Sequence, residues 1–362
     1  MRDRLRVAVA GLGIGAEHVR SYRALPELFE VTAVCDPDAA RAERVAKEFE
    51  VPRVMARFED LVAERELDVV DVCTPPHHHF AHASRALEAG KHVVCEKPLV
   101  GSLAEVDALA DLEERSGRRL MPIFQYRFGA GLQKLVHLVG RGVAGRHYLT
   151  TIEIAWRRGL DYYGAAPWRG RWQTELGGIL LTHAIHAHDM LTHVVGPVRS
   201  VFARTATRVN PVETEDCASL SLEMADGSLA TSAATLGSHK EITRLRFCFE
   251  KLTAESNPAP YVPQFEPWTL TPASPEVEVE IEAALRDFDP GPQWFPGQLA
   301  RFHAALATGS ELPVTIADAR AALELVTAAY HCAETGRPVE LPIGKEHPKY
   351  ASWLPSARGP ID

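Results

Sequence analysis

The chain has 362 residues, enough for two domains of ordinary size. A formal net charge of -9 argues against a nucleic-acid or anionic-membrane surface, and 46% apolar with 24% charged residues is ordinary for a globular protein. No run reaches the roughly 18 apolar residues that a membrane span needs, and the start, MRDRLRVAVAG, predicts a strand rather than a signal peptide. Six scattered cysteines without a CxxC pair favour a reducing cytoplasm.

A glycine-rich loop follows the first predicted strand, residues 5–11, and leads into a predicted helix, AEHVRSYRAL. The loop, GLGIGA, fills the G-x-G-x-x-G/A pattern, whose glycines let the backbone approach a pyrophosphate at a helix N-terminus. Because the strand and the helix that this motif requires are both present, the sequence predicts a dinucleotide-binding loop. Its residues are Gly11, Gly13, Ile14, Gly15 and Ala16.

The second predicted strand, FEVTAVCD, ends on Asp36. An acidic side chain at this position can accept a hydrogen bond from a ribose 2′-hydroxyl and repels a 2′-phosphate. Pro37 and Asp38 follow, with no arginine beside them to receive a phosphate. The sequence therefore predicts NAD as the cofactor in preference to NADP. The alternative is that Asp36 caps the next helix, DAARAERVAKEF.

Helices and strands continue to alternate up to about residue 125. The next predicted elements are the helix FEDLVAER, the strand DVVDVCT, the helix HHHFAHASRALEAG, the strand KHVVCEKP, the helix SLAEVDALADLEERSG and the strand RLMPIFQYR. This alternation predicts an α/β fold with a doubly wound parallel sheet, an N-terminal Rossmann domain over residues 1–125. Thr74 and Pro75 then lie at a strand end, on the edge where ligands bind.

The stretch VVCEKP places a lysine where a buried strand ends. A side chain at the carboxyl end of a strand in an open α/β sheet points into the ligand crevice, which makes Lys97 a candidate site residue. Glu96 is adjacent, but neighbours on a strand face opposite ways, so the two do not simply form a salt bridge. Pro98 restricts the backbone of Lys97 and could take a cis bond. The alternative is a surface strand end with ordinary charges.

After Gly145 the pattern changes to a run of strands separated by turn signals. The predicted strands are HYLTTIEIAWRR, VRSVFARTATRV, DCASLSLEM, SLATSAATL, ITRLRFCFE and EVEVEIE, and two helices, GQLARFHAALATG and IADARAALELVTAAYHCAETG, close the chain. Such a run is typical of an antiparallel sheet, so residues 126–362 are predicted to form an α+β second domain.

One predicted helix of the second domain, GGILLTHAIHAHDMLTHVVG, carries four histidines, His183, His186, His188 and His193. His186, Asp189 and His193 share one face because they are spaced i, i+3, i+7. The imidazoles could line a substrate pocket and move protons, could bind a metal ion, or could be hydrogen-bonded core and surface residues.

Aromatic and arginine side chains are dense in AWRRGLDYYGAAPWRGRW. Aromatic faces stack on sugar rings, and arginine donates to hydroxyls or to an acidic group. The segment therefore suggests a sugar or acidic-sugar ligand, and the alternative is an interface loop between subunits. Its candidate substrate-binding residues are Trp156, Arg158, Tyr163, Trp168 and Arg169.

With these motifs in order, the chain resembles the glucose–fructose oxidoreductase, inositol dehydrogenase and rhizopine-catabolism family, shortened to Gfo/Idh/MocA. The resemblance rests on GLGIGA, Asp36, the Glu96-Lys97-Pro98 tripeptide after a strand, and the later helix carrying H-x-x-D. It implies NAD(P)-dependent oxidoreductase activity. It also implies that the second domain has a large, mostly antiparallel sheet whose open face commonly forms dimers or tetramers.

The resemblance also implies roles for single residues. It makes Lys97 the residue that orients and helps deprotonate the reacting hydroxyl, and His186 its proton-transfer partner. It places Glu96, Thr74, Pro75, His79 and Gln125 along the cofactor, and it implies substrate-side positions for Lys97, Arg127, Thr182, His183 and His186. No metal is expected, because hydride chemistry on NAD needs none.

The chain departs from this family at one position. Many members carry an aspartate four residues before the catalytic histidine, where this chain has Thr182. A hydroxyl cannot act as a carboxylate base, so proton transfer is expected to depend more on Lys97 and His186, with His183 as a possible contributor.

The sequence thus predicts a cytoplasmic, homo-oligomeric NAD-dependent enzyme that acts on a secondary alcohol or ketone of a sugar, sugar acid or cyclitol. Two rival hypotheses are a catalytically silent NAD-dependent sugar sensor on the same fold and, less favoured, a metal-dependent lyase or hydrolase built on the histidine helix.

Overall fold

The structure is a computed structural model that describes residues 4–355. The chain divides into two compact units: the first extends to Gln125 and also includes Pro292–Arg320, and the second comprises Tyr126–Gly291 and the chain from Ala321 onward. The sequence-based boundary falls at the same place, but it leaves residues 292–320 with the second domain. The outer ends of the two predicted domains, residues 1–3 and 356–362, lie outside the described residues.

The first unit contains a six-stranded sheet of order β3-β2-β1-β4-β5-β6 within the described residues, and every neighbouring pair is parallel. Its strands are β1 (Leu5–Ala10), β2 (Phe29–Cys35), β3 (Val54–Met55), β4 (Val69–Val72), β5 (His92–Cys95) and β6 (Leu120–Pro122). The chain order reverses at β1, so the carboxyl ends of β1, β4 and β5 border the position where such sheets bind ligands. The predicted doubly wound sheet is confirmed.

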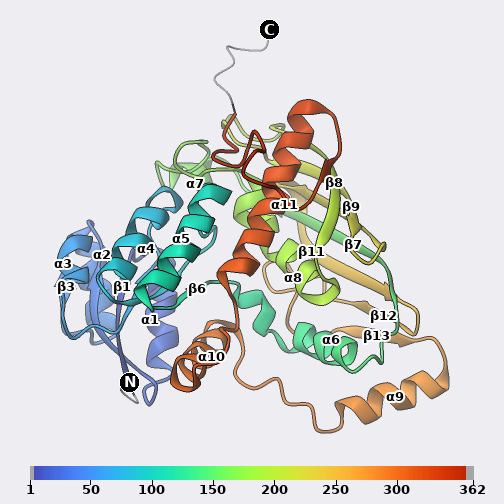
Figure 1. The fold of residues 1–362 in the computed structure, drawn as a ribbon, viewed down its shortest axis with the longest axis horizontal. Coiled ribbons are helices and arrows are strands. Elements are labelled where there is room, and N and C mark those ends of the chain that lie inside the picture. Colours follow the sequence, from blue (N-terminus) through green and yellow to red (C-terminus); the bar gives the residue numbers. More distant parts are fainter. Residues whose placement is uncertain (1–3, 356–362) are drawn as a thin grey trace. The chain divides into compact units, whose positions relative to one another are not determined.

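The helices of the first unit lie between these strands, except for one contributed by the later segment. They are α1 (Gly15–Arg23), α2 (Ala39–Glu48), α3 (Phe58–Val62), η1 (Pro76–His78), α4 (His79–Glu88), α5 (Leu103–Ser116) and α10 (Trp294–Thr308). Helix α4 packs beside α5, and α10 packs against α1 (Figure 1). The predicted helix GQLARFHAALATG is therefore real, but it belongs to the first unit.

The second unit contains an eight-stranded sheet of order β13-β12-β11-β7-β10-β9-β8-β14 within the described residues. Its strands are β7 (His147–Arg157), β8 (Val198–Ala206), β9 (Cys217–Met224), β10 (Leu229–Thr235), β11 (Gly237–Phe249), β12 (Leu252–Glu255), β13 (Thr269–Pro272) and β14 (Val339–Glu340). Only β7 and β10 pair in parallel within the described sheet. The prediction of a large, mostly antiparallel sheet is confirmed.

The helices of the second unit include the histidine segment, which begins as a π-helix. They are η2 (Gln125–Phe128, which starts at the unit boundary), α6 (Ala130–Gly140), α7 (Leu160–Gly164), the π-helical η3 (Leu180–Ala184), α8 (Ile185–Val195), α9 (Pro275–Leu285) and α11 (Ile316–Thr335), within which the second boundary falls. Helix α8 packs against β7 and α6. Within the described residues, no helix has both the length and the apolarity that a membrane span requires.

The prediction of a strand over EVEVEIE is wrong, because these residues form the helix α9. The side chain of Ser274 caps this helix by accepting a hydrogen bond from the Val277 N–H, and Pro275 occupies the first turn. Val277 and Ile281, four residues apart, are buried on one face, while Val279 is 64% exposed. The alternation of valine and glutamate thus concealed an i, i+4 apolar pair.

Candidate active site

The glycine loop joins β1 to α1 in the conformation that the motif requires. Gly11 has φ +88°, and a Cβ there would lie 2.5 Å from the Cys73 carbonyl oxygen, so only glycine fits. A Cβ on Gly15 would lie 3.0 Å from Cγ1 of Val9, which reflects close packing of the helix on the strand. No described atom lies within 4 Å of the Cβ position of Gly13. The loop therefore offers an open backbone cradle at a helix N-terminus.

Asp36 supports this loop directly. Its buried carboxylate accepts hydrogen bonds from the backbone N–H of Leu12 at 2.8 Å and of Asp38 at 2.9 Å. The alternative role for Asp36, capping α2, is wrong, because Asp38 is the N-cap and accepts from the Arg41 N–H. Asp36 is thus held at the strand end, as a ribose-binding acid requires.

An arginine does stand beside Asp36 in space, although none is adjacent in sequence. Arg41, in the first turn of α2, places its Nη1 atom 3.3 Å from Oδ2 of Asp36. The Arg41 side chain is 41% exposed, so solvent can reach it. The argument that no arginine stands near the strand end to receive a phosphate is therefore wrong, because Arg41 pairs with Asp36 and with Asp38.

The loop after β4 is connected to the Lys97 loop through one buried imidazole. His79 lies with Nδ1 2.7 Å from the Pro98 carbonyl oxygen and Nε2 2.7 Å from the Thr74 carbonyl oxygen. Burial lowers the pKa of His79, and the hydrogen bonds to the two carbonyl oxygens oppose this shift. His79, predicted to lie along the cofactor, therefore has both ring nitrogens directed at backbone carbonyl oxygens, which links the Thr74 loop to Pro98.

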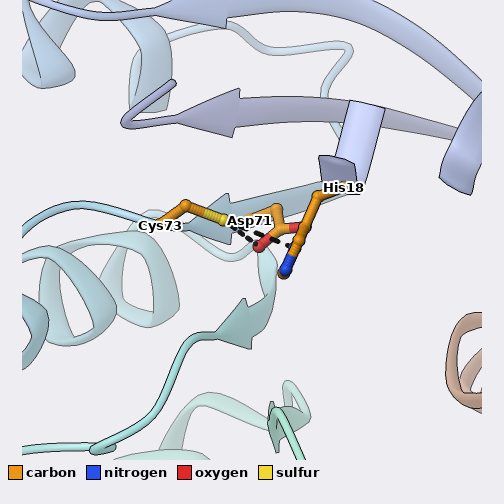
Figure 2. A group of neighbouring side chains, drawn as sticks. All are labelled: His18, Asp71 and Cys73. Atoms are coloured by element: carbon orange, nitrogen blue, oxygen red, sulfur yellow. Dashed lines mark hydrogen bonds and ion pairs between the residues drawn. The ribbon is translucent and has the colours of Figure 1, made fainter. Parts of the chain in front are cut away.

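Behind Glu96 lies a buried charged cluster that the sequence analysis missed, drawn in Figure 2. Nδ1 of His18, from α1, is 2.8 Å from Oδ2 of Asp71 in β4, and its Nε2 is 3.2 Å from Oε1 of Glu96. The Cys73 thiol lies 3.3 Å from both Nδ1 of His18 and Oδ1 of Asp71. An aspartate inside an otherwise apolar strand, VVDV, was the one available sequence signal.

Lys97 follows this cluster directly. Its backbone N–H donates to Oε2 of Glu96 at 2.9 Å, its side chain is partly exposed, and its peptide bond to Pro98 is cis.

Gln125, at the end of the first unit, is buried, and its Oε1 has no hydrogen-bond partner within the described residues. A buried acceptor left in this way is the kind of group that a bound ligand satisfies. Together with the open glycine loop and Asp36, these residues fit NAD.

In the second unit, a buried glutamate fixes the start of the histidine segment. Glu215 accepts hydrogen bonds from the backbone N–H groups of Gly178 and Leu180 at 3.0 and 3.1 Å, and from the Tyr330 hydroxyl at 2.9 Å. Burial raises the pKa of Glu215 to about 7, although these donors oppose the shift. A Cβ on Gly178 would lie 1.8 Å from the Glu215 carbonyl oxygen, so glycine is required there.

Thr182 determines which nitrogen of His183 carries the proton. The Thr182 hydroxyl donates to the Gly178 carbonyl oxygen at 2.7 Å, and its oxygen lies 2.6 Å from Nδ1 of His183. Because a hydroxyl has one proton, Nδ1–H must be the donor of the second bond, which leaves Nε2 of a neutral ring as an acceptor. The His183 ring lies against Trp156 and Tyr162, with centroid distances of 5.1 and 5.9 Å.

The other residues of the histidine helix have different roles. His186 is buried and stacked on Tyr126, with a centroid distance of 4.3 Å and an interplanar angle of 7°. Asp189 forms a buried ion pair with Arg127 and accepts two hydrogen bonds from it, from Nε at 2.8 Å and from Nη2 at 2.6 Å. Arg127, predicted to bind substrate, is thus engaged with Asp189. His188 lies in the core, 3.0 Å from the Ser232 hydroxyl, and burial lowers its pKa to about 4.

The predicted substrate-binding aromatic residues and arginines form one cluster around Arg158. Its guanidinium lies 5.0 to 5.4 Å from the ring centroids of Trp156, Tyr162 and Tyr261, and it donates to the Tyr261 hydroxyl. Arg169 lies 4.0 Å above Tyr162 and 5.3 Å from Trp168. Tyr163 lies edge-on to Tyr162. These contacts bring Trp156, His183, Arg158 and Arg169 together, with the Trp156 side chain buried.

A separate, open hollow of about 830 Å³ lies in the second unit. Its lining includes His331, Arg337 and Lys349 and none of the predicted site residues. We therefore do not assign the active site to this hollow, because the glycine loop, Lys97 and the histidine helix do not line it.

A parallel sheet with a glycine loop and an acidic second-strand end defines a dinucleotide-binding domain. Two family models match the chain: the "Oxidoreductase family, NAD-binding Rossmann fold" over residues 5–124 and the "GFO/IDH/MocA C-terminal domain" over residues 132–255. The chain therefore belongs to the GFO/IDH/MocA family, as the sequence motifs suggest. The predicted cofactor, NAD, is confirmed.

Similar proteins act on sugars. D-Glucoside 3-dehydrogenase of Escherichia coli (strain K12) is 29% identical over 360 residues, 93% of this chain and 97% of that protein. The WlbA dehydrogenase from Bordetella pertussis, solved with NADH and UDP-GlcNAcA, matches with a TM-score of 0.83 at 25% identity over 94% of this chain and all of that one. Levoglucosan dehydrogenase, solved with NADH and levoglucosan, shares the fold, with a TM-score of 0.82 at 21% identity over 94% of this chain and 99% of that one.

Asp36→Asn is expected to raise the affinity for NADPH relative to NADH by about tenfold or more. The change removes one of the two carboxylates that pair with Arg41, the other being Asp38, so the guanidinium can pair more strongly with a 2′-phosphate. The amide oxygen of the asparagine can still accept from the Leu12 N–H. Dissociation constants from nucleotide fluorescence measure the ratio. Adding Arg41→Gln should reverse most of the gain, and an unchanged ratio in Asp36→Asn would contradict the role of this pair.

The stability of the second unit is expected to depend on the protonation of Glu215. Because burial raises its pKa to about 7, the folded state binds more protons than the unfolded state between about pH 4.5 and 7. This contribution to the free energy of unfolding is therefore present at low pH and lost as the pH rises through about 7. In urea unfolding at pH 5 and pH 8, Glu215→Gln should lose less stability than the wild type. The exposed Glu213→Gln should behave like the wild type, and equal losses in all three proteins would contradict the assignment.

Proposed function

We propose that this protein is an NAD-dependent dehydrogenase that transfers a hydride between the cofactor and a secondary alcohol or ketone of a sugar, sugar acid or cyclitol. The observation that carries the proposal is Lys97, held by its own backbone N–H on a buried carboxylate at the carboxyl end of β5. The glycine loop follows β1 and the Thr74 loop follows β4, and β4 lies between β1 and β5 in the same sheet. Similarity to a D-glucoside dehydrogenase and to a dehydrogenase solved with a nucleotide-linked sugar acid supports the substrate class.

The first unit holds the cofactor and moves one proton. Gly11 and Gly13 leave room for the pyrophosphate, and Asp36 accepts a hydrogen bond from the adenosine ribose. When bound, NAD accepts or returns the hydride. Lys97 takes the proton of the reacting hydroxyl as the alcohol is oxidised and returns it in the reverse direction. Because Glu96 holds the Lys97 N–H, the backbone position from which the lysine side chain extends is restricted, which favours one orientation of the amine.

The second unit supplies substrate contacts and a second proton-transfer group. His186, stacked on Tyr126, serves as the proton-transfer partner that the family resemblance implies. The His183 Nε2 acceptor, set by Thr182, accepts a hydrogen bond from a substrate hydroxyl. Rings of the Arg158 cluster pack on sugar carbons, while Arg158 and Arg169 donate to hydroxyls or to a carboxylate.

Lys97→Met is expected to lower turnover by about 10²–10⁴-fold, because it deletes the proton-transfer amine but keeps the length of the side chain. The substrate is found first, by screening sugars, cyclitols and uronic acids for NADH absorbance. Lys97→Arg should be similarly impaired, since a guanidinium does not release its proton at neutral pH. NADH affinity, followed by fluorescence, should change far less. Wild-type turnover in Lys97→Met, or loss of NADH binding in parallel with activity, would contradict the proposal.

His186→Phe is expected to lower turnover on the order of 10²-fold or more, because phenylalanine can stack on Tyr126 but cannot carry a proton. His183→Ala should chiefly raise KM. His188→Leu, at a core position with its ring against Ser232, is the matched control and should retain near-normal turnover. Thorough treatment with EDTA should leave activity unchanged. Near-normal turnover in His186→Phe, or activity lost with EDTA and restored by zinc, would overturn these roles.

The assembly and compartment form part of the same proposal. Strands β9 and β10 alternate between buried and exposed residues, so one face of the second sheet is open, and we expect it to form a homodimer or homotetramer. Light scattering of the purified chain measures the subunit count. All six cysteines are free thiols, which supports a reducing, cytoplasmic compartment.

A further inference from the structure

We infer that His18 is a positioning residue, which holds Glu96, and through it Lys97, in the geometry that proton transfer needs. This inference rests on the proposed role of Lys97. His18 lies on the helix that follows the glycine loop and has no exposed surface. Its ring nitrogens lie within hydrogen-bonding distance of Asp71, Glu96 and Cys73, and of these Glu96 is the residue that holds the Lys97 N–H.

The first step concerns the two carboxylates that face the His18 ring. Oδ2 of Asp71 and Oε1 of Glu96 lie 2.8 and 3.2 Å from its two nitrogens, as Figure 2 shows for Asp71. An ionised carboxylate only accepts hydrogen bonds, so both nitrogens must donate, and the ring is an imidazolium. Burial acts to lower the pKa of His18, but Asp71 and Cys73 outweigh it, and the pKa is raised well above its usual value.

The second step concerns Glu96, which is buried and held at both oxygens. Its Oε1 faces His18, and its Oε2 accepts from the Lys97 N–H at 2.9 Å. Burial acts to raise the pKa of Glu96, but His18 and Lys97 outweigh it and hold the pKa below its ordinary value. The Glu96 carboxylate thus connects His18 of α1 to the backbone N–H of Lys97. Without the imidazolium, it would be a buried charge lacking one partner, free to move or to take up a proton.

The third step concerns the neighbours that keep the imidazolium in place. Asp71 lies within β4, and its second oxygen accepts from the Cys73 thiol at 3.3 Å. Phe295 of α10 covers the ring with a centroid distance of 4.5 Å. Asp71, Cys73 and Phe295, the neighbours of the ring, are therefore all buried residues of the first unit. The ring has no room to rotate away, which suits a group whose function is to hold another.

A metal ion on His18, Asp71 and Cys73 is the other arrangement that this cluster suggests, because three ligand atoms lie within 4.8 Å of one another. The distance between Nδ1 of His18 and Oδ2 of Asp71, 2.8 Å, is that of a hydrogen bond with the proton between the atoms. Two ligands about 2.0 Å from a tetrahedral metal would lie about 3.3 Å apart. The geometry therefore favours the proton-held cluster.

The test uses the variant His18→Leu/Asp71→Val, which removes the imidazolium together with its main partner and so avoids leaving Asp71 as an unpaired buried charge. We expect turnover to fall about 10²-fold, as small displacements of a reacting group can cause. The NADH dissociation constant should change less than about threefold. Ser21→Ala, a buried change on the same helix outside the cluster, is the matched control and should keep wild-type turnover.

A second measurement separates positioning from a general structural effect. In a Lys97→Met background the same double change should lower the residual turnover less than about threefold, because there is no longer an amine to position. Single variants His18→Gln and His18→Leu extend this, since the glutamine amide can still donate to one carboxylate and should restore part of the activity lost in His18→Leu.

Several outcomes overturn the inference. They are wild-type turnover in a folded His18→Leu/Asp71→Val protein, an equal loss with and without Lys97, or one equivalent of tightly bound metal in protein purified without a His tag. If instead Lys97→Met alone keeps full turnover, the proposed function fails first. The two failures are therefore distinguishable.

Discussion

The geometry of the proposed catalytic lysine in the first unit depends on two buried carboxylates, one within β4 and one directly after β5. Glu96 and Asp71 are both removed from water, and an isolated buried charge costs several kcal/mol. The His18 imidazolium, which lies between them, offsets that cost with one hydrogen bond to each. Since the other oxygen of Glu96 holds the Lys97 N–H, the electrostatic requirement of the core also sets the backbone geometry of the proposed catalytic lysine.

The second unit meets the same requirement with different chemistry. Asp189 is neutralised by the two donors of Arg127, which fixes the face of α8 that carries His186. Glu215 instead accepts hydrogen bonds from two backbone N–H groups and a hydroxyl, and burial keeps its pKa raised although these donors oppose the shift. It fixes the chain where η3 begins, and π-helical turns often occur at functional sites. In each case a buried carboxyl group, and not apolar packing alone, fixes the backbone that carries a candidate functional side chain.

The sequence could predict what depends on neighbours along the chain. A strand, a glycine loop and a helix follow one another within about 20 residues, and Glu96-Lys97-Pro98 is contiguous. Both motifs could therefore be recognised in the sequence. The groups that hold them were not, because their partners are far apart: His18 and Asp71 are separated by 53 residues, and Arg127 and Asp189 by 62. Arg41 was missed because a helical turn returns it to Asp36. Periodicity failed where Val277 and Ile281 satisfied both a strand and a helix pattern.

Thr182 shows how a departure from a family pattern can change which group does the chemistry. A carboxylate at that position could take a proton itself, whereas a hydroxyl can only pass on a hydrogen bond. Because the Thr182 proton is directed to the Gly178 carbonyl oxygen, its oxygen accepts from Nδ1 of His183. The lone pair on His183 Nε2 then becomes the hydrogen-bond acceptor that the threonine does not provide.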